Sequence, residues 1–469
     1  MSSQPTELVA DYVYNLQWQD LPQEVVEFAK LRVLDYLASA MAGYKLNHIF
    51  NATTTKMFRE MGGKKESGVL FSDLQLPAPN AAFLNAAYGH GADIDDGHRT
   101  AQGHPGIVVI PAALALGEAE KITGKDLIVS IVAGYDIFVR LATAVNPSHF
   151  NRGFHSTGTV GTIAAGGAAA KALKLDKNAV RNALSLAAMQ TGGLHEVSES
   201  GQSSKPMSPA KAASGGVLSA RLAQLGIEGP QLPLEGEKGF LRAFTDKFDF
   251  EVLKKDLGHK FAITTCYAKL YPACRHTHGA LDAAVSLNKI IAGSFEQIAK
   301  VKIYTYPAAI TITGSIFEPA SKDEAKFSLP YAVAIGLLKG KFGLEHLEVG
   351  RSFDSKVREL VRKIEIVSDP AMEDRTANIR GAKVQVLFQD GSSKEVAVKL
   401  PKGDPEVPVS QGDIENKLKL CAEGLIPADR QQALIEAVWG LEKMTELSTL
   451  LTLCDSSSEL CATSRTMGS

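Results

Sequence analysis

The spacing of apolar residues constrains this chain most, because it changes from a helical period to a strand period. From Glu7 to about Leu225, apolar residues recur at every third or fourth position, with breaks at Gly or Pro. This pattern predicts one helix after another, most clearly over residues 22–42, 80–88, 125–145, 157–173 and 176–189. Residues 164–170 are all Ala or Gly, which favours close packing between helices of a core.

A second pattern begins near Ile298. Residues 298–306 alternate as a strand does, and residues 384–398 predict a hairpin that turns at Asp390-Gly391. Between them we expect helices at 329–338 and 354–363 and a strand at 364–367. Helical periodicity then returns over 410–425 and 429–453, a stretch too short to bury a core alone, so we assign it to the first domain.

We therefore expect a mainly α protein with an α+β second domain, arranged as a large all-helical domain and a smaller α+β lid domain. The helical domain is expected to comprise residues 1–262 and 402–453, and the lid residues 263–401. Residues 454–469 are rich in Ser and are expected to form a disordered tail. Two domains fit a chain of 469 residues, because single cores stop growing at roughly 250 to 300 residues.

Charge and composition exclude several classes of protein. The formal net charge is −2 and no long block of Lys or Arg is present, so nucleic acid is not an expected partner. Apolar runs such as 107–116 and 127–133 are shorter than the roughly 20 residues that span a bilayer, so no membrane is expected. The N-terminus lacks the pattern of a secretory signal and the five cysteines are scattered, which favours the reducing cytoplasm.

The densest group of ionisable residues lies between Asp93 and His104. Aspartates and histidines can be tuned into acid and base roles near neutral pH, and Arg99 offers a planar fork for a carboxylate. A calcium loop counted from Asp93 would need Gly at its sixth position and Glu at its twelfth, where this chain has His98 and His104. A solvated turn is the plain alternative, and no spacing typical of a metal site supports a metal.

Three later clusters contain further candidates. Residues 152–161 place His155 before a small-residue helix whose exposed N–H groups favour anions, although His155 could equally be a hydrogen-bonded core histidine. Residues 200–211 are polar and contain Lys205, although lysines are mostly surface charges. Residues 269–278 lie at the predicted domain junction, where ligand sites are common, and a small buried hydrophobe is an equal alternative for Cys274. The other candidates there are Lys269, Arg275 and His276.

These four clusters, in this order and on a helical and then α+β layout, resemble the MmgE/PrpD family over about residues 7–453. The likeness rests on an ordered set of short motifs: Asp93-x-Asp95-Asp96 with His104-Pro105, Gly153-Phe154-His155 with Thr159-Val160-Gly161, Lys205-Pro206, Lys269-x-Tyr271-Pro272 with His278, and Phe327-Ser328-Leu329-Pro330-Tyr331. The family includes 2-methylcitrate dehydratases, cis-aconitate decarboxylases and iminodisuccinate epimerase.

The resemblance implies a homodimer with a cofactor-free site that moves protons next to a carboxylate. By similarity, the catalytic positions are Asp93, His104, His155, Lys205, Lys269 and Tyr331. We expect the substrate to be bound by Arg99, His98, Cys274, Arg275 and His276. The chain departs from the decarboxylase branch at Gly97-His98-Arg99 and at Cys274-Arg275-His276, so the resemblance assigns a class of reaction and not a substrate.

We therefore expect a lyase that dehydrates or decarboxylates a small citrate- or aconitate-like acid, in the manner of 2-methylcitrate dehydratase, by general acid–base catalysis. The alternative enzyme is an epimerase or isomerase of an amino- or imino-dicarboxylate such as iminodisuccinate, which needs two opposed acid–base groups. A catalytically silent carboxylate-binding protein is the alternative from another class, and the many titratable residues argue against it.

Overall fold

The computed structural model describes residues 4–199, 204–291, 293–374 and 379–455, and the chain divides into two compact units. Unit 1 comprises Met1–Gly91, Asp95–Cys266 and Gln411–Ser469, and unit 2 comprises Ala92–Ile94 and Tyr267–Ser410. The predicted boundaries at 262/263 and 401/402 lie four and nine residues before the observed ones at 266/267 and 410/411. Of the predicted tail, Cys454 is buried behind the last helix, whereas residues 456–469 lie outside the described part of the chain.

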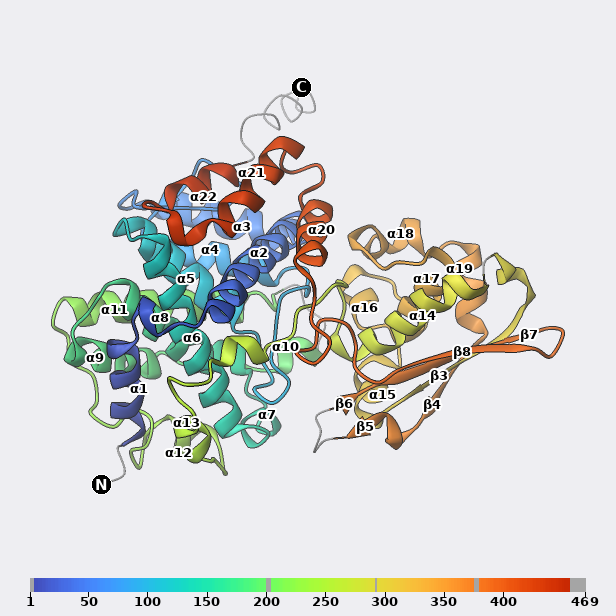
Figure 1. The fold of residues 1–469 in the computed structure, drawn as a ribbon, viewed down its shortest axis with the longest axis horizontal. Helices are drawn as coiled ribbons and strands as arrows, with labels where there is room; N and C mark the ends of the chain where they lie inside the picture. The colour runs from blue at the N-terminus through green and yellow to red at the C-terminus, as the bar shows by residue number, and fades with distance from the viewer. Residues whose placement is uncertain (1–3, 200–203, 292, 375–378, 456–469) are drawn as a thin grey trace. The chain divides into compact units, whose positions relative to one another are not determined.

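Unit 1 is built from helices because its apolar residues follow the helical period. Figure 1 shows them from α1 in blue to α22 in red. The main helices are α1 (Pro5–Asn15), α2 (Gln23–Leu46), α3 (His48–Met61), α4 (Ala78–His90), α5 (Gly106–Ala119), α6 (Gly124–Val145), α8 (Ser156–Ala172), α9 (Lys177–Met189), α11 (Met207–Gln224), α20 (Gln411–Ala422), α21 (Ala428–Trp439) and α22 (Ser448–Leu453). Short pieces are α7 (Ser148–Asn151), α10 (Glu196–Glu199), α12 (Phe240–Phe244), α13 (Glu251–Lys254) and the strands β1 (Ser67–Gly68) and β2 (Gln75–Leu76).

Helix α8 lies at the centre of unit 1, packed against α5, α6, α9 and α11. Its small residues make this possible, because they let neighbouring backbones approach closely. At the crossing with α11, a Cβ on Gly216 would lie 2.5 Å from the Cβ of Ala165, which is closer than real Cβ atoms come. The run of Ala and Gly therefore serves packing, as the sequence predicts.

Among the described residues, α6 is long and apolar enough by length and composition to cross a membrane. Of its most apolar window, 94% is buried inside the protein, as in the core helix of a soluble fold. The helix also contains Asp136, which is fully buried and accepts hydrogen bonds from Arg140 and from the hydroxyl of Tyr12. We therefore assign α6 to the core of unit 1.

The C-terminal helices return to unit 1, where α20 and α21 pack against α2. In Figure 1 the red C-terminal helices lie beside the blue α2 accordingly. A buried ion pair joins them, in which Lys417 Nζ lies 2.5 Å from Asp35 Oδ1, with side-chain exposures of 3% and 2%. A charge buried in this way is stable only while its partner is present.

Replacement of Lys417 by Met is expected to lower the free energy of unfolding by about 3–5 kcal/mol, because it leaves the Asp35 carboxylate buried without its cation. Chemical denaturation followed by circular dichroism measures the change. Lys419→Met is the matched control on the exposed face of the same helix and is expected to change stability by less than about 0.5 kcal/mol. Equal effects of the two variants would show that the pair contributes nothing.

Unit 2 contains a four-stranded sheet with the strand order β4-β3-β7-β8. Strand β3 (Ile298–Thr305) pairs in parallel with β4 (Ile364–Ser368) and antiparallel with β7 (Ala382–Phe388), which forms the hairpin with β8 (Ser393–Val398). Helix α14 (His278–Ile291) packs on β7 and β8 and against α17 (Leu329–Lys339), which contacts α19 (Ser355–Arg362). Shorter pieces are α15 (Pro307–Thr313), α16 (Lys322–Lys326), α18 (Val349–Ser352), β5 (Glu373–Asp374) and β6 (Ile379–Arg380). A mainly α protein with an α+β second unit is thus confirmed.

Candidate active site

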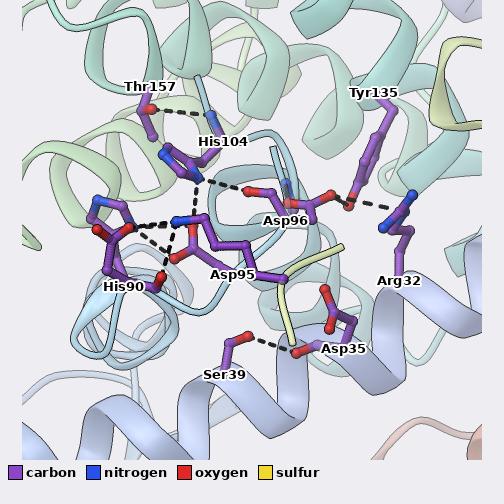
Figure 2. A network of polar contacts seen from close by, with 12 residues as sticks. Arg32, Asp35, Ser39, His90, Asp95, Asp96, His104, Tyr135 and Thr157 are labelled. Atoms are coloured by element: carbon purple, nitrogen blue, oxygen red, sulfur yellow. Dashed lines mark hydrogen bonds and ion pairs between the residues drawn. The ribbon is translucent and has the colours of Figure 1, made fainter. Parts of the chain in front are cut away.

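The loop between α4 and α5 is held by Asp96, which is buried. Its carboxylate accepts a hydrogen bond from the Tyr135 hydroxyl at 2.7 Å and from the backbone N–H of Gly106 at 3.0 Å, at the start of α5. Burial raises the pKa of Asp96 to about 6, although Arg32, whose Nε lies 4.0 Å away, opposes the rise. Figure 2 shows Asp96 with Tyr135 and Arg32, beside the cluster around Asp95.

Asp95 is the centre of the polar cluster in unit 1. Its carboxylate is 1% exposed and lies 3.1 Å from His90 Nδ1 and 2.9 Å from His104 Nδ1. Figure 2 shows the two imidazoles converging on it from the end of α4 and from the loop before α5. Burial alone would raise the pKa of Asp95, but the two imidazoles outweigh it and hold that pKa well below its usual range. Asp95 is therefore the ionised acceptor for both rings.

The proton on His104 is placed by a second contact of the same nitrogen. His104 Nδ1 lies 2.6 Å from the backbone oxygen of Asp96, and a carbonyl oxygen only accepts hydrogen bonds. Nδ1 therefore carries the hydrogen, and in the neutral ring the lone pair lies on Nε2. The imidazole of His104 is 14% exposed, so this cluster presents a partly accessible, oriented base.

His155 lies directly before α8 and is 4% exposed. Its ring centroid is 6.3 Å from that of His90, and its Nδ1 is buried without a hydrogen-bond partner among the described residues. Burial, together with His90 and Lys205, holds the pKa of His155 well below its usual range. Lys205 is half-buried, and its charge also lowers the pKa of His90. Residues 200–203, which precede Lys205 in the predicted motif, are outside the described residues.

Unit 2 contains Asp93 and Lys269. Lys269 Nζ donates hydrogen bonds to Asp93 Oδ1 at 2.7 Å and to the Asp93 backbone oxygen at 2.9 Å. The side chains of Asp93 and Lys269 are 6% and 2% exposed, respectively. The backbone of Asp93 is in the left-handed region, with φ 55°. The structure thus joins two of the predicted catalytic residues in one buried ion pair.

The other candidates of unit 2 are engaged elsewhere. Arg275 donates to Asp404 Oδ1 at 2.8 Å and to the backbone oxygens of Pro401 and Lys402, so both terminal nitrogens of its expected carboxylate fork are occupied. His276 Nδ1 lies 2.5 Å from the Tyr306 hydroxyl, and burial lowers the pKa of His276 to about 3. Cys274 is half-buried beside them.

Tyr331, in α17, is fully buried, and its hydroxyl donates to the backbone oxygen of His346 at 2.7 Å. That bond is within unit 2 and ties α17 to the segment that follows it. The hydroxyl of Tyr331, a catalytic position by family resemblance, is therefore bonded to a backbone oxygen in this structure.

His98 and Arg99 complete the predicted cluster. His98 Nδ1 accepts the backbone N–H of Ala101 at 3.1 Å, which closes the turn 98–103, and Arg99 is buried. With Thr100, His98 lines a cavity of about 490 Å³ in unit 1. None of His90, His104 or His155 lines that cavity, so the structure separates His98 from the imidazole cluster.

His90 is the residue of this cluster that sequence reasoning missed, and Asp95 was noted only as part of a motif. The available signal was position, since His90 and His104 flank the Asp95-Asp96 pair in sequence. A single histidine at the end of an apolar helix does not show which later segment its ring meets. Only the fold brings it to Asp95 and to His155, which lies 65 residues further on in the chain.

By distance alone, ligand atoms of His90, Asp95 and His104 lie within 4.8 Å of one another, close enough for a metal ion. The hydrogen bonds to Asp95 use the same Nδ1 atoms, and His104 Nδ1 also bonds a carbonyl. A metal would have to displace both protons, so we interpret the cluster as hydrogen-bonded. Prolonged dialysis against a chelator is expected to leave the activity unchanged, and activity restored only by an added divalent ion would contradict this.

The helical unit thus contains an oriented carboxylate–imidazole cluster, and the α+β unit contains a buried carboxylate–lysine pair; both consist of groups that can transfer protons. Residues 7–253 match the MmgE/PrpD N-terminal domain and residues 271–443 match the MmgE/PrpD C-terminal domain. The chain belongs to the MmgE/PrpD family.

Relatives with named activities match most of the chain. Cis-aconitate decarboxylase of Homo sapiens is 28% identical over 467 residues, which cover 96% of this chain and 94% of the relative. Cis-aconitate decarboxylase of Aspergillus terreus is 27% identical, with coverages of 96% and 95%. The 2-methylcitrate dehydratase of Salmonella typhimurium is 26% identical over 364 residues, which cover 71% of this chain and 72% of the relative.

Proposed function

We propose that this protein is a lyase that removes CO₂ or water from a small citrate- or aconitate-like acid without a cofactor. The observation that carries the proposal is the orientation of His104, whose Nδ1 donates to Asp95 and to the Asp96 carbonyl and whose Nε2 is left to exchange a proton. Family membership supports the class of reaction.

Both reactions pass through a carbanion-like state beside a carboxylate. In decarboxylation the C–C bond to the departing carboxylate breaks, its electron pair is delocalised toward a remaining carboxylate as an enolate-like carbanion, and an imidazolium protonates that carbanion on carbon. In dehydration a neutral imidazole takes the proton from carbon, and an acid protonates the hydroxide that leaves. An adjacent ammonium stabilises the developing enolate charge in either case.

We assign the proton transfers to His104 and His155 and charge stabilisation to Lys205, whose charge lowers the pKa of His155. In unit 2 we assign Lys269 to a substrate carboxylate and Asp93 to hold and polarise that lysine. Tyr331 remains an expectation from the family alone, since its hydroxyl is bonded to backbone. The same holds for Arg99, His98, Cys274, Arg275 and His276 as substrate-binding residues.

Decarboxylation of a cis-aconitate-like acid is the first choice between the two reactions. The decarboxylases of Homo sapiens and Aspergillus terreus each match 96% of this chain, whereas the dehydratase of Salmonella typhimurium matches 71%. Dehydration of a citrate-like acid is the second choice.

Incubation with citrate, 2-methylcitrate, cis-aconitate and iminodisuccinate, followed by proton NMR in D₂O, tests the proposal. The expected result is loss of CO₂ from cis-aconitate with one solvent deuteron on the product carbon, or loss of water from a citrate. Proton exchange into iminodisuccinate alone would identify an epimerase instead. Binding of the acids without any turnover would identify a carboxylate-binding protein.

We further propose a cytoplasmic homodimer. Large apolar side chains are exposed on and after α9 and α11, including Met189 at 67% and Leu225 at 79%, which supports a protein interface there. The four described cysteines form no disulfide with one another, as is usual in a reducing compartment. Light scattering is expected to give twice the chain mass of 50.1 kDa, and fractionation is expected to recover the protein with cytosolic markers.

A further inference from the structure

The ring of His90 is fully buried beside Asp95. His90 is the last residue of α4, and its side chain is 0% exposed. Nδ1 lies 3.1 Å from both oxygens of Asp95, so one edge of the ring is satisfied. Nε2 is buried and has no hydrogen-bond partner among the described residues. Such an atom is costly to bury, and proteins pair nearly all of them.

A second unpaired nitrogen belongs to the neighbouring ring. His155 Nδ1 is also buried without a partner in the described part of the chain, and the centroids of the two rings are 6.3 Å apart. His104 is equally near, with its centroid 5.0 Å from that of His90. Two adjacent imidazoles, one at the end of α4 and one directly before α8, each have a nitrogen without a partner among the described residues, which indicates that a polar group of a ligand completes them.

The chemistry of that ligand follows from the proton on His90. Asp95 is ionised and accepts from Nδ1–H, so in the neutral ring Nε2 is an acceptor. Burial, partly offset by Asp95 and reinforced by Lys205 and His104, lowers the pKa of His90 to about 4. A substrate oxygen that carries a proton can therefore donate to Nε2, and a carboxylate oxygen can pair with it once the ring has taken up a proton.

We propose that His90 is a third imidazole of the active site, which contacts the substrate directly: its Nε2 pairs with an oxygen of the bound polycarboxylic acid while Asp95 holds its Nδ1. The inference rests on the proposed function and adds a residue to it. One carboxylate, Asp95, then orients two substrate-facing rings, His90 and His104.

Two isosteric variants separate substrate contact from simple support of Asp95. In His90→Asn the amide nitrogen can replace Nδ1 as donor to Asp95, but nothing replaces Nε2. Its kcat/KM on cis-aconitate is expected to fall about 100-fold. In His90→Gln the amide reaches the position of Nε2 and is expected to recover part of KM and little of kcat. His149→Asn is the matched control, since His149 is equally buried in unit 1 but pairs at both nitrogens, with Phe244 and Thr159.

Measurement on the unaltered protein guards against variants that fold poorly. With ¹⁵N-labelled histidine, saturation with tricarballylate, an unreactive tricarboxylate, is expected to shift the His90 Nε2 resonance from that of a bare lone pair toward a hydrogen-bonded or protonated nitrogen. An unchanged resonance at saturation, or wild-type kcat/KM in His90→Asn, would overturn the inference. Failure of the proposed function is distinct, because then the wild-type protein would release neither CO₂ nor water from any of the four acids.

Discussion

Replacement of His104 or His155 by Ala is expected to lower kcat on the verified acid by about 100- to 10,000-fold, the usual contribution of a positioned acid or base. The structural reason is strongest for His104, because Asp95 and the Asp96 carbonyl hold its Nδ1 and leave Nε2 for substrate. For His155 the reason is its Nδ1, which is buried beside His90 and has no hydrogen-bond partner in the part of the chain that the structure describes.

Steady-state kinetics on protein shown to be folded by circular dichroism measures the effect. His149→Ala provides the control for loss of a buried imidazole in unit 1, since both of its nitrogens are paired outside the cluster. That variant is expected to lose stability and to keep kcat per folded molecule. If His104→Ala and His155→Ala both retain kcat near wild type, the assignment of the site is wrong.

Replacement of Lys269 by Met is expected to lower the free energy of unfolding by about 3–5 kcal/mol and to abolish measurable turnover. The stability loss follows because the Asp93 carboxylate, 6% exposed, is left buried without the ammonium 2.7 Å away. The exposed Lys394→Met on β8 is the control and is expected to change stability by less than about 0.5 kcal/mol.

The double variant Asp93→Asn/Lys269→Met separates the structural part of this effect from the catalytic part. Removing both charges is expected to recover most of the lost stability, because no uncompensated ion remains. Turnover is not expected to return, since the lysine proposed to hold a substrate carboxylate is still absent. Recovery of activity together with stability would limit the pair to a structural role.

The layout of the fold could be predicted because its signals are local. The change of period near Ile298 marks the sheet of unit 2, and Asp390-Gly391 marks its hairpin, with Gly391 at φ 84°. Helical spacing likewise predicts α2, α6 and α8 to within a few residues.

The partners of the candidate residues could not be predicted, because they depend on packing between distant segments. From the sequence we expect the guanidinium of Arg275 to bind a substrate carboxylate, yet it pairs with Asp404, 129 residues later. The sequence around His90 predicts only the end of a helix, yet the ring of His90 lies beside Asp95 and His155. His98 stands in the densest ionisable cluster, yet it closes a turn and lines another cavity.

The position of α20 in the chain has a consequence for how the protein is made. The ribosome synthesises Asp35 long before Lys417, and the whole of residues 267–410 emerges in between. Until then the cation that lies 2.5 Å from Asp35 and the helices that pack against α2 from the C-terminal segment have not yet been made. Synthesis of unit 1 therefore starts before that of unit 2 and ends after it. A recombinant unit 1 requires residues 411–455 joined by a linker to Cys266.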